Sequence, residues 1–111
     1  MNGKGKEYNG FNDDLLFEGE YLNGKKNGKG KKYNDGYLIY EGEYLNGKRN
    51  GKGKEYCFVH LIYEGKYLNG KRNGKSKEYN FDGNLEFEGE FINNNISNGK
   101  KYDKEGKIIL E

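Results

Sequence analysis

A 17-residue motif recurs along this chain at a nearly constant spacing, and this repetition constrains the fold more than any other feature. The segment Tyr40–Tyr56 reads YEGEYLNGKRNGKGKEY. Phe17–Tyr33 matches it at 14 of 17 positions and Tyr63–Tyr79 at 15 of 17, and a fourth, decayed copy begins at Phe87. Repetition at a period of this length is typical of folds in which one small structural unit is stacked on the next.

The composition by itself leaves order and disorder open. The mean hydropathy is -1.25 and 34% of the residues are charged, which disfavours a packed core. The net charge is only +2, however, and 15% of the residues are aromatic, so a thin aromatic core can form. The central glycines of the four copies, Gly19, Gly42, Gly65 and Gly89, are 23, 23 and 24 residues apart. Because a disordered low-complexity chain does not keep such a phase, we expect one folded domain.

Each copy carries the pattern of a β-hairpin. In residues 17–22, aromatic residues and glycine alternate with charged or aliphatic residues, a period of two that is typical of a strand. Asn23-Gly24 follows, and later Asn27-Gly28. Asn-Gly is the strongest short-range turn signal because both residues tolerate positive φ. We expect Gly28–Tyr33 to return as the second strand. Since 19 glycines oppose helix, the chain predicts an all-β fold, a single-layer antiparallel meander of about ten short strands.

The repeats divide the chain into one domain that begins and ends within a repeat. Asn2–Tyr8 is identical to Asn50–Tyr56, the second half of a copy. Half-hairpins leave exposed strand edges, so we expect end-to-end dimers or an array that continues in a longer protein. The predicted divisions of domain 1–111 are a half repeat 1–14, repeats 15–37, 38–60, 61–84 and 85–106, and a half repeat 107–111.

The two faces of the predicted sheet differ in chemistry. Gly42 lies on the same face as Tyr40 and Tyr44, where its missing side chain leaves room for rings from a neighbouring strand. The opposite face places acids on the first strand of each hairpin and lysines on the second, which predicts cross-strand ion pairs. The first strands carry Glu18/Glu20, Glu41/Glu43, Glu64/Lys66 and Glu88/Glu90, and the second strands carry Lys29/Lys31, Lys52/Lys54 and Lys75/Lys77.

A second set of basic residues lies at the predicted turns, without an acidic neighbour there. These residues should form a basic ridge along one edge, able to meet anionic lipid headgroups or nucleic acid. Nucleic acid is the less expected ligand because the whole chain is nearly neutral, and no amphipathic helix or lipidation motif adds a second membrane signal. The ridge residues are Lys25, Lys26, Lys48, Arg49, Lys71 and Arg72.

Catalytic and metal chemistry find little support in the sequence. The hydroxyl side chains other than tyrosine are Ser76 and Ser97, and no nucleophile motif surrounds either one. Cys57 and His60 are three residues apart but lack a second pair that would complete a zinc site. We therefore predict a non-enzyme without cofactor or metal. The single cysteine and an N-terminus without an apolar segment favour a cytoplasmic location.

The repeated residues resemble the MORN repeat, in which an aromatic, an acid, glycine, any residue and an aromatic precede a turn and a Gly-x-Gly return strand. The resemblance covers practically the whole chain, and Tyr40, Gly42 and Tyr44 match it position by position. The fourth copy departs from the pattern. There Asn94 replaces the turn glycine, the turn is expected to be one residue longer, and Lys101 stands where a return-strand glycine would fall.

The resemblance implies an elongated, twisted sheet with a groove lined by aromatic residues, used for binding and scaffolding. We expect the module to recognise another protein through that groove, as a scaffold, an adaptor or a stoichiometric inhibitor of an enzyme. Peripheral binding to anionic lipid headgroups through the basic ridge is the alternative, and homo-oligomers can form through the sheet edges. The candidate partner-binding residues, one per repeat, are Tyr21, Tyr44, Tyr67 and Phe91.

Overall fold

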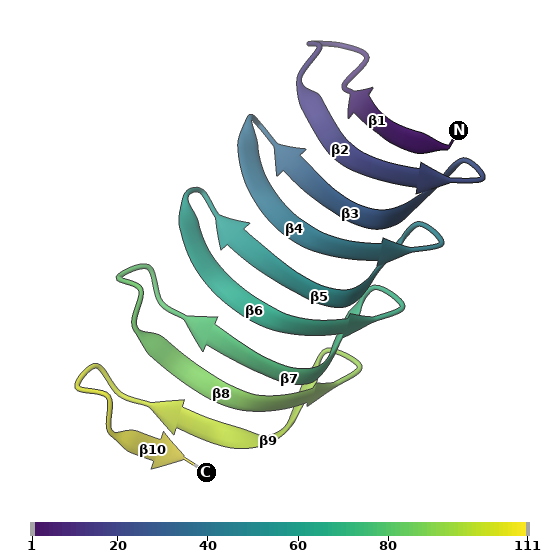
Figure 1. The fold of residues 1–111 in the computed structure, drawn as a ribbon. Coiled ribbons are helices and arrows are strands. Elements are labelled where there is room, and N and C mark those ends of the chain that lie inside the picture. The colour runs from purple at the N-terminus through teal and green to yellow at the C-terminus, as the bar shows by residue number, and fades with distance from the viewer. Residues whose placement is uncertain (1, 111) are drawn as a thin grey trace.

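The computed structural model describes residues 2–110 and contains one antiparallel sheet of ten strands, in which each strand pairs only with its neighbours in the chain (Figure 1). This confirms the predicted all-β meander. Met1 and Glu111, the outer ends of the two predicted half repeats, lie outside the described residues. The strands are β1 (Gly3–Tyr8), β2 (Leu15–Leu22), β3 (Lys25–Asn34), β4 (Tyr37–Leu45), β5 (Lys48–Cys57), β6 (His60–Leu68), β7 (Lys71–Tyr79), β8 (Leu85–Ile92), β9 (Asn95–Tyr102) and β10 (Ile108–Leu110).

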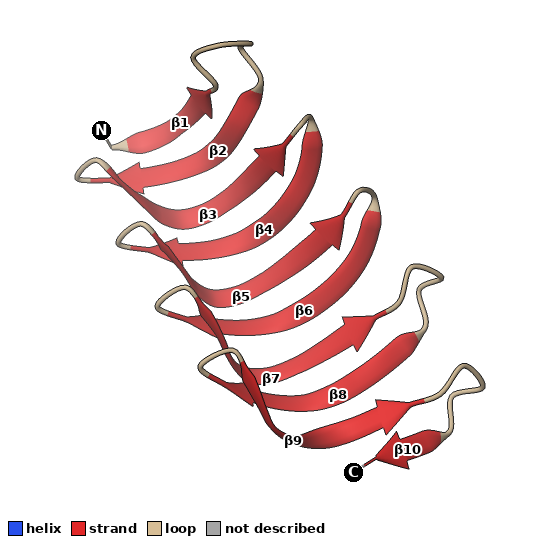
Figure 2. Cartoon of the chain, turned by 180° about the vertical axis from the view of Figure 1, so that it is seen from behind, coloured by secondary structure: helices blue, strands red, loops and turns tan. Residues whose placement is uncertain are grey.

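The sheet is elongated because each hairpin is added beside the previous one. Its principal extents are 47 × 26 × 18 Å, and β1 and β10 form the two outer edges (Figure 2). Successive strands curve in the same direction, so the sheet is bowed along the direction of its strands (Figure 2). Stability in such an array comes mainly from contacts within one repeat and between adjacent repeats.

Tight two-residue turns close the hairpins, as the Asn-Gly signal predicts. Asn46 and Gly47 have φ of 50° and 87°, the left-handed values of a type I′ turn. In the fourth hairpin Asn93 and Asn94 adopt φ of 49° and 71° in the same place. The prediction of a longer fourth turn was therefore wrong, because asparagine also tolerates the left-handed conformation.

The fourth repeat differs instead within its second strand. Gly99 pairs with Gly89, so the glycine expected at Lys101 is present two residues earlier. From the turn to that glycine, β9 has one residue fewer than the return strands of the other hairpins. The pairs nearest the turn are equivalent, since Phe91 pairs with Ile96 and Tyr44 with Arg49. Farther from the turn, Gly89 pairs with Gly99, whereas Gly42 pairs with Gly53, which is one residue farther along the chain. The fourth copy thus keeps its turn and shortens its bulge.

The second Asn-Gly of each repeat lies inside a strand. The return strand β3 begins at Lys25, three residues before the predicted start at Gly28, and Gly28 forms a bulge with φ of 104°. The amide of Asn46 donates to the Asn27 side-chain oxygen over 3.4 Å, and Asn69 donates to Asn50 over 3.2 Å. The second asparagine therefore links each turn to the turn of the next repeat.

A column of small residues crosses the sheet and carries the aromatic core. A Cβ atom on Gly42 would lie 2.6 Å from both the Cα of Gly53 and the Tyr40 hydroxyl oxygen, so only glycine fits there. The rings of Phe17, Tyr40 and Phe87 lie against glycines of their own and the next strand. The column consists of Gly5, Gly19, Gly30, Gly42, Gly53, Gly65, Ser76, Gly89 and Gly99.

Gly42→Ala tests this packing. The new methyl group would meet backbone atoms of β5 that cannot move independently, so we expect a loss of roughly 1–3 kcal/mol in the free energy of unfolding. Urea denaturation measures this loss. Gly10→Ala is the matched control, since a Cβ there has no neighbour within 4 Å among the described residues. Equal stability of the two variants would show that close ring-to-backbone packing is not needed.

Candidate binding groove

The four aromatic residues expected to meet a partner are part of the core. Tyr21, Tyr44, Tyr67 and Phe91 are only 8%, 6%, 4% and 3% exposed. Each packs edge-on against the first aromatic of a repeat; for example, the ring centroids of Tyr40 and Tyr67 are 5.3 Å apart at 89°. These contacts join one repeat to the next. The side chains hold the sheet together and leave little area for another molecule.

The basic ridge separates into two groups. Lys26, Arg49 and Arg72 turn onto the aromatic layer, with their charged ends 4.2, 4.1 and 3.9 Å from the ring centroids of the first aromatic of their hairpins. Such cation–π contacts contribute roughly 0.5–2 kcal/mol each. The other three residues of the ridge remain exposed, namely Lys25, Lys48 and Lys71. The structure thus leaves half of the expected ridge directed toward solvent.

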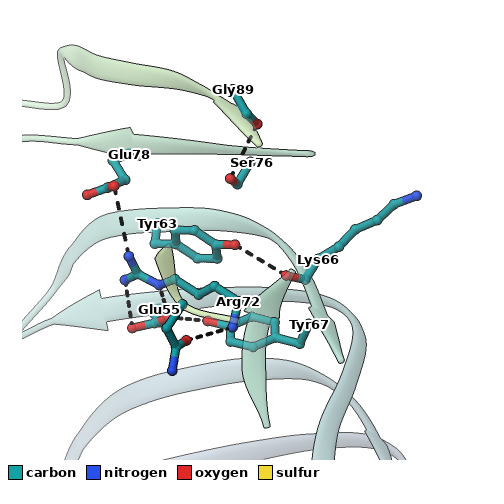
Figure 3. Close-up of polar contacts among 9 residues, drawn as sticks. Glu55, Tyr63, Lys66, Tyr67, Arg72, Ser76, Glu78 and Gly89 are labelled. Atoms are coloured by element: carbon teal, nitrogen blue, oxygen red, sulfur yellow. Dashed lines mark hydrogen bonds and ion pairs between the residues drawn. The ribbon is translucent and has the colours of Figure 1, made fainter. Parts of the chain in front are cut away.

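Arg72 also belongs to a half-buried polar cluster (Figure 3). Its Nε donates to Glu55 over 3.0 Å, and the Tyr67 hydroxyl donates to the same carboxylate. Burial opposes the charge of Glu55, but the hydrogen bonds from Arg72 and Tyr67 outweigh burial and lower its pKa. Arg72 Nη1 lies 3.9 Å from Glu78 as well. In this cluster the charge of Arg72 is compensated by Glu55 on β5 and Glu78 on β7. The sequence of the turn alone did not indicate these acidic partners.

A long groove lies on the charged face of the described sheet. It has a volume of about 1790 Å³ and extends from Lys4 on β1 to Asn98 on β9. The backbone of the glycine column forms its floor, and nine lysines and seven glutamates form its walls. Among the described residues that line this groove, the expected aromatic side chains are absent, because the rings pack on the other side of the same glycines. In total, therefore, the walls of the groove carry nearly balanced charge.

One wall alternates in charge at every strand. Register pairs Glu41 with both Lys31 and Lys54, and the same pattern continues in both directions. Two of these pairs lie within ion-pair distance, Lys6–Glu18 at 3.7 Å and Lys77–Glu88 at 3.8 Å. The predicted placement of acids beside bases is confirmed. The complete row is Lys6, Glu18, Lys31, Glu41, Lys54, Glu64, Lys77, Glu88 and Lys100.

Tyrosines at the ends of the return strands bond to this wall, which sequence reasoning missed. The Tyr56 hydroxyl donates to Glu41 over 2.9 Å, and the Tyr79 hydroxyl donates to Glu64 over 2.5 Å. Tyr56 lies on the same face of β5 as the groove lysines Lys52 and Lys54, because the extra residue of the register shift, Ile62, is on the partner strand β6. The period of two that places Lys54 and Lys77 on the charged face was the sequence signal that could have placed these tyrosines there as well.

The candidate catalytic and metal-binding residues have structural contacts. Ser76 is buried in the glycine column and donates to the Gly89 carbonyl over 3.5 Å. His60 pairs with Cys57 in the sheet and stacks on Phe81 with ring centroids 5.0 Å apart. Within residues 2–110, no group of three or more histidine, cysteine, aspartate or glutamate side chains could hold a metal ion. The same part of the chain has no helix of the length and apolarity that crossing a membrane requires.

The groove tyrosines predict a loss of stability at alkaline pH. Burial, together with hydrogen bonds to Glu41 and Glu64, raises the pKa of Tyr56 and of Tyr79 from 10.0 to about 12. A raised pKa stabilises the folded state fully below pH 10, and this contribution is lost as pH rises toward 12. Urea denaturation between pH 8 and about 12 should show the decline. In Tyr56→Phe the decline should be smaller; an unchanged decline would contradict the assignment.

Comparison with known protein families agrees with the repeat pattern. The model of the MORN repeat matches residues 17–36, 40–58 and 63–84. These segments coincide with the first three hairpins and the loops that follow them. A search of curated proteins gave no significant match. Since the matched segments cover more than half of the chain and the observed sheet of hairpins has the expected architecture, the chain belongs to the MORN-repeat family.

Proposed function

We propose that this chain is a non-catalytic binding module that holds an extended segment of another protein in its charged groove. The MORN repeat is in general a non-catalytic repeat module, which is consistent with this function. The observation that carries the proposal is the groove itself, which continues across β1–β9 with a backbone floor and charged walls. By occupying a partner in this way, the module acts as a scaffold, an adaptor or a stoichiometric inhibitor in the cytoplasm.

The dimensions of the groove favour an extended chain. The sheet is 47 Å long, which corresponds to about 14 residues at ~3.3 Å per residue in a strand-like segment. The alternating lysines and glutamates can pair with a segment of complementary charge pattern, which favours recognition of sequence over general attraction. A polyanion gains less, because seven glutamates lie beside the nine lysines of the walls.

The buried aromatic residues support this function indirectly, by stiffening the sheet that carries the groove. Tyr44 and its counterparts lock adjacent repeats together, and a stiff sheet keeps both walls of the groove in position. Pre-organised walls reduce the entropy lost on binding. In this proposal the four predicted aromatic residues therefore contribute to partner binding by holding the groove in shape, and they do not contact the partner themselves.

Binding to anionic lipid through the ridge has weaker support. Each basic residue near an anionic membrane contributes roughly 1 kcal/mol. Only Lys25, Lys48 and Lys71 of the six ridge residues are exposed, and the other three lie on aromatic rings. Three exposed charges provide a modest attraction at physiological salt.

Two matched charge reversals distinguish the surfaces. Lys54→Glu changes the groove wall, and Lys48→Glu makes the same change on the exposed ridge of the same hairpin. A partner captured from the native host by the full chain should bind Lys54→Glu at least tenfold more weakly, since the new glutamate repels the acidic residue of the partner that Lys54 attracts. Isothermal titration with the purified partner measures this difference.

Lys48→Glu should leave the partner affinity unchanged, and thermal unfolding confirms that both variants are folded. Sedimentation with vesicles of anionic and neutral lipid provides the other arm. Loss of anionic-vesicle binding in Lys48→Glu, with partner affinity unaffected by Lys54→Glu, would reverse the ranking of the two functions.

A further inference from the structure

The bulges of the first two complete repeats each hold a carboxylate. Glu20 Oε1 accepts a hydrogen bond from the Lys29 amide over 2.9 Å, and Glu43 Oε2 accepts one from the Lys52 amide over 2.5 Å. Each carboxylate lies against the bulge glycine that precedes the donating amide. The bulge backbone is thus a binding position for a carboxylate, filled in these repeats from within the chain.

The third repeat keeps the bulge but lacks the carboxylate. Gly74 has φ of 114°, close to the 100° of Gly51, so the backbone has the same form. Lys66 replaces the glutamate, and its aliphatic stem lies near Gly74, where an added Cβ would be 3.2 Å from Lys66 Cβ. Among residues 2–110, no side chain accepts a hydrogen bond from the Lys75 amide. No carboxylate of its own repeat therefore accepts this amide, and the flexible stem of Lys66 lies over the bulge instead.

The same replacement interrupts the charge pattern of the second wall. Lys52 pairs directly with Lys66, where the equivalent pair elsewhere joins a lysine to a glutamate, as in Lys29–Glu43. Like charges opposite each other are destabilising. In chain order across the sheet the row reads Lys4, Glu20, Lys29, Glu43, Lys52, Lys66, Lys75 and Glu90, so three lysines follow one another at this point.

We propose that the bulge of the third repeat is a recognition site for a carboxylate, supplied by an aspartate or glutamate of the bound partner segment. The partner carboxylate accepts the Lys75 amide hydrogen bond, in the way that Glu20 and Glu43 accept the equivalent bonds in the two preceding repeats. Lys52 and Lys66 neutralise its charge from two strands. This inference rests on the proposed function and names one residue class that the groove selects.

The surroundings favour a single negative charge. Glu43 accepts the amide of Lys52 on one side of the lysine cluster, and Glu90 pairs with Lys75 on the other. These two acids limit the excess positive charge, which disfavours a dianionic phosphate relative to a carboxylate. The bulge has also accommodated a carboxylate twice within the same chain, which is the geometric reason to choose this ligand.

Amide NMR of the full chain tests the site directly. The probe is a synthetic twelve-residue peptide of serine and glycine with one central glutamate, and the control peptide has glutamine in its place. We expect the glutamate peptide to shift the Lys75 amide resonance downfield and to bind roughly tenfold more tightly than the control, the value of one charge-assisted hydrogen bond. No movement of the Lys75 amide would overturn the proposal.

Variants of Lys66 distinguish occupation of the bulge by a carboxylate from a general effect of changing the charge of the protein. Lys66→Glu restores the pattern of the first two repeats, so the free variant should already show the downfield Lys75 amide and should no longer respond to the peptide. Lys66→Gln should still respond, with reduced affinity. Lys71→Glu, the same charge change at the exposed turn, should respond as the unmodified chain does. An equal loss in Lys71→Glu would overturn the site.

Two comparisons test the ligand class and the link between this site and the proposed function. If inorganic phosphate or anionic vesicles move the Lys75 amide at lower concentration than the peptide does, the carboxylate assignment is wrong. If partner binding depends on Lys54 while the peptide leaves Lys75 unmoved, only this inference fails. If the peptide moves Lys75 while partner binding ignores Lys54→Glu, the proposed function fails and the carboxylate site remains.

Discussion

Close packing of aromatic rings against a glycine column is the interaction on which the rest of this structure depends. Over residues 2–110 the sheet has one layer, so its apolar side chains have no second sheet or helix to cover them. Tyr40 and Tyr63 are nevertheless fully buried, because their rings lie over glycine backbone and under an arginine. Ser76 is the largest residue that this column holds among the described residues, and a bulkier side chain would remove that space. Packing against the glycine backbone therefore buries the rings, as a second layer does in other β proteins.

This packing also decides which surface is available to other molecules. Rings of adjacent repeats meet edge-to-face, and the cations of the hairpins lie over them, so the aromatic face is closed by its own residues. The charged face stays open across the described strands, and its groove extends along nine of them. The function proposed for this chain follows from that asymmetry, because the open surface carries a defined charge order with one interruption at Lys66.

Much of the fold could be predicted from local sequence. Asn46-Gly47 indicated a turn and Gly42 a close approach of rings, and the acids and bases of the charged face occupy facing positions. The second Asn-Gly was misleading, since the same dipeptide suits a bulge as well as a turn. The fourth repeat was misaligned for a related reason. Its bulge is one residue shorter, and a shortened bulge and a lengthened turn look alike in a sequence.

The sequence by itself determined the repeating hairpin, the glycine and aromatic face, and the alternating charged face, because these follow from the period of two and from turn chemistry within a few residues. Only the tertiary structure decided that Tyr44 is core, that Arg49 turns inward, and that Tyr56 bonds to a groove acid. Those outcomes depend on rings packing between adjacent repeats and on the pairing of each strand with its neighbours. Both are contacts between strands, so they arise only when the repeats are assembled side by side.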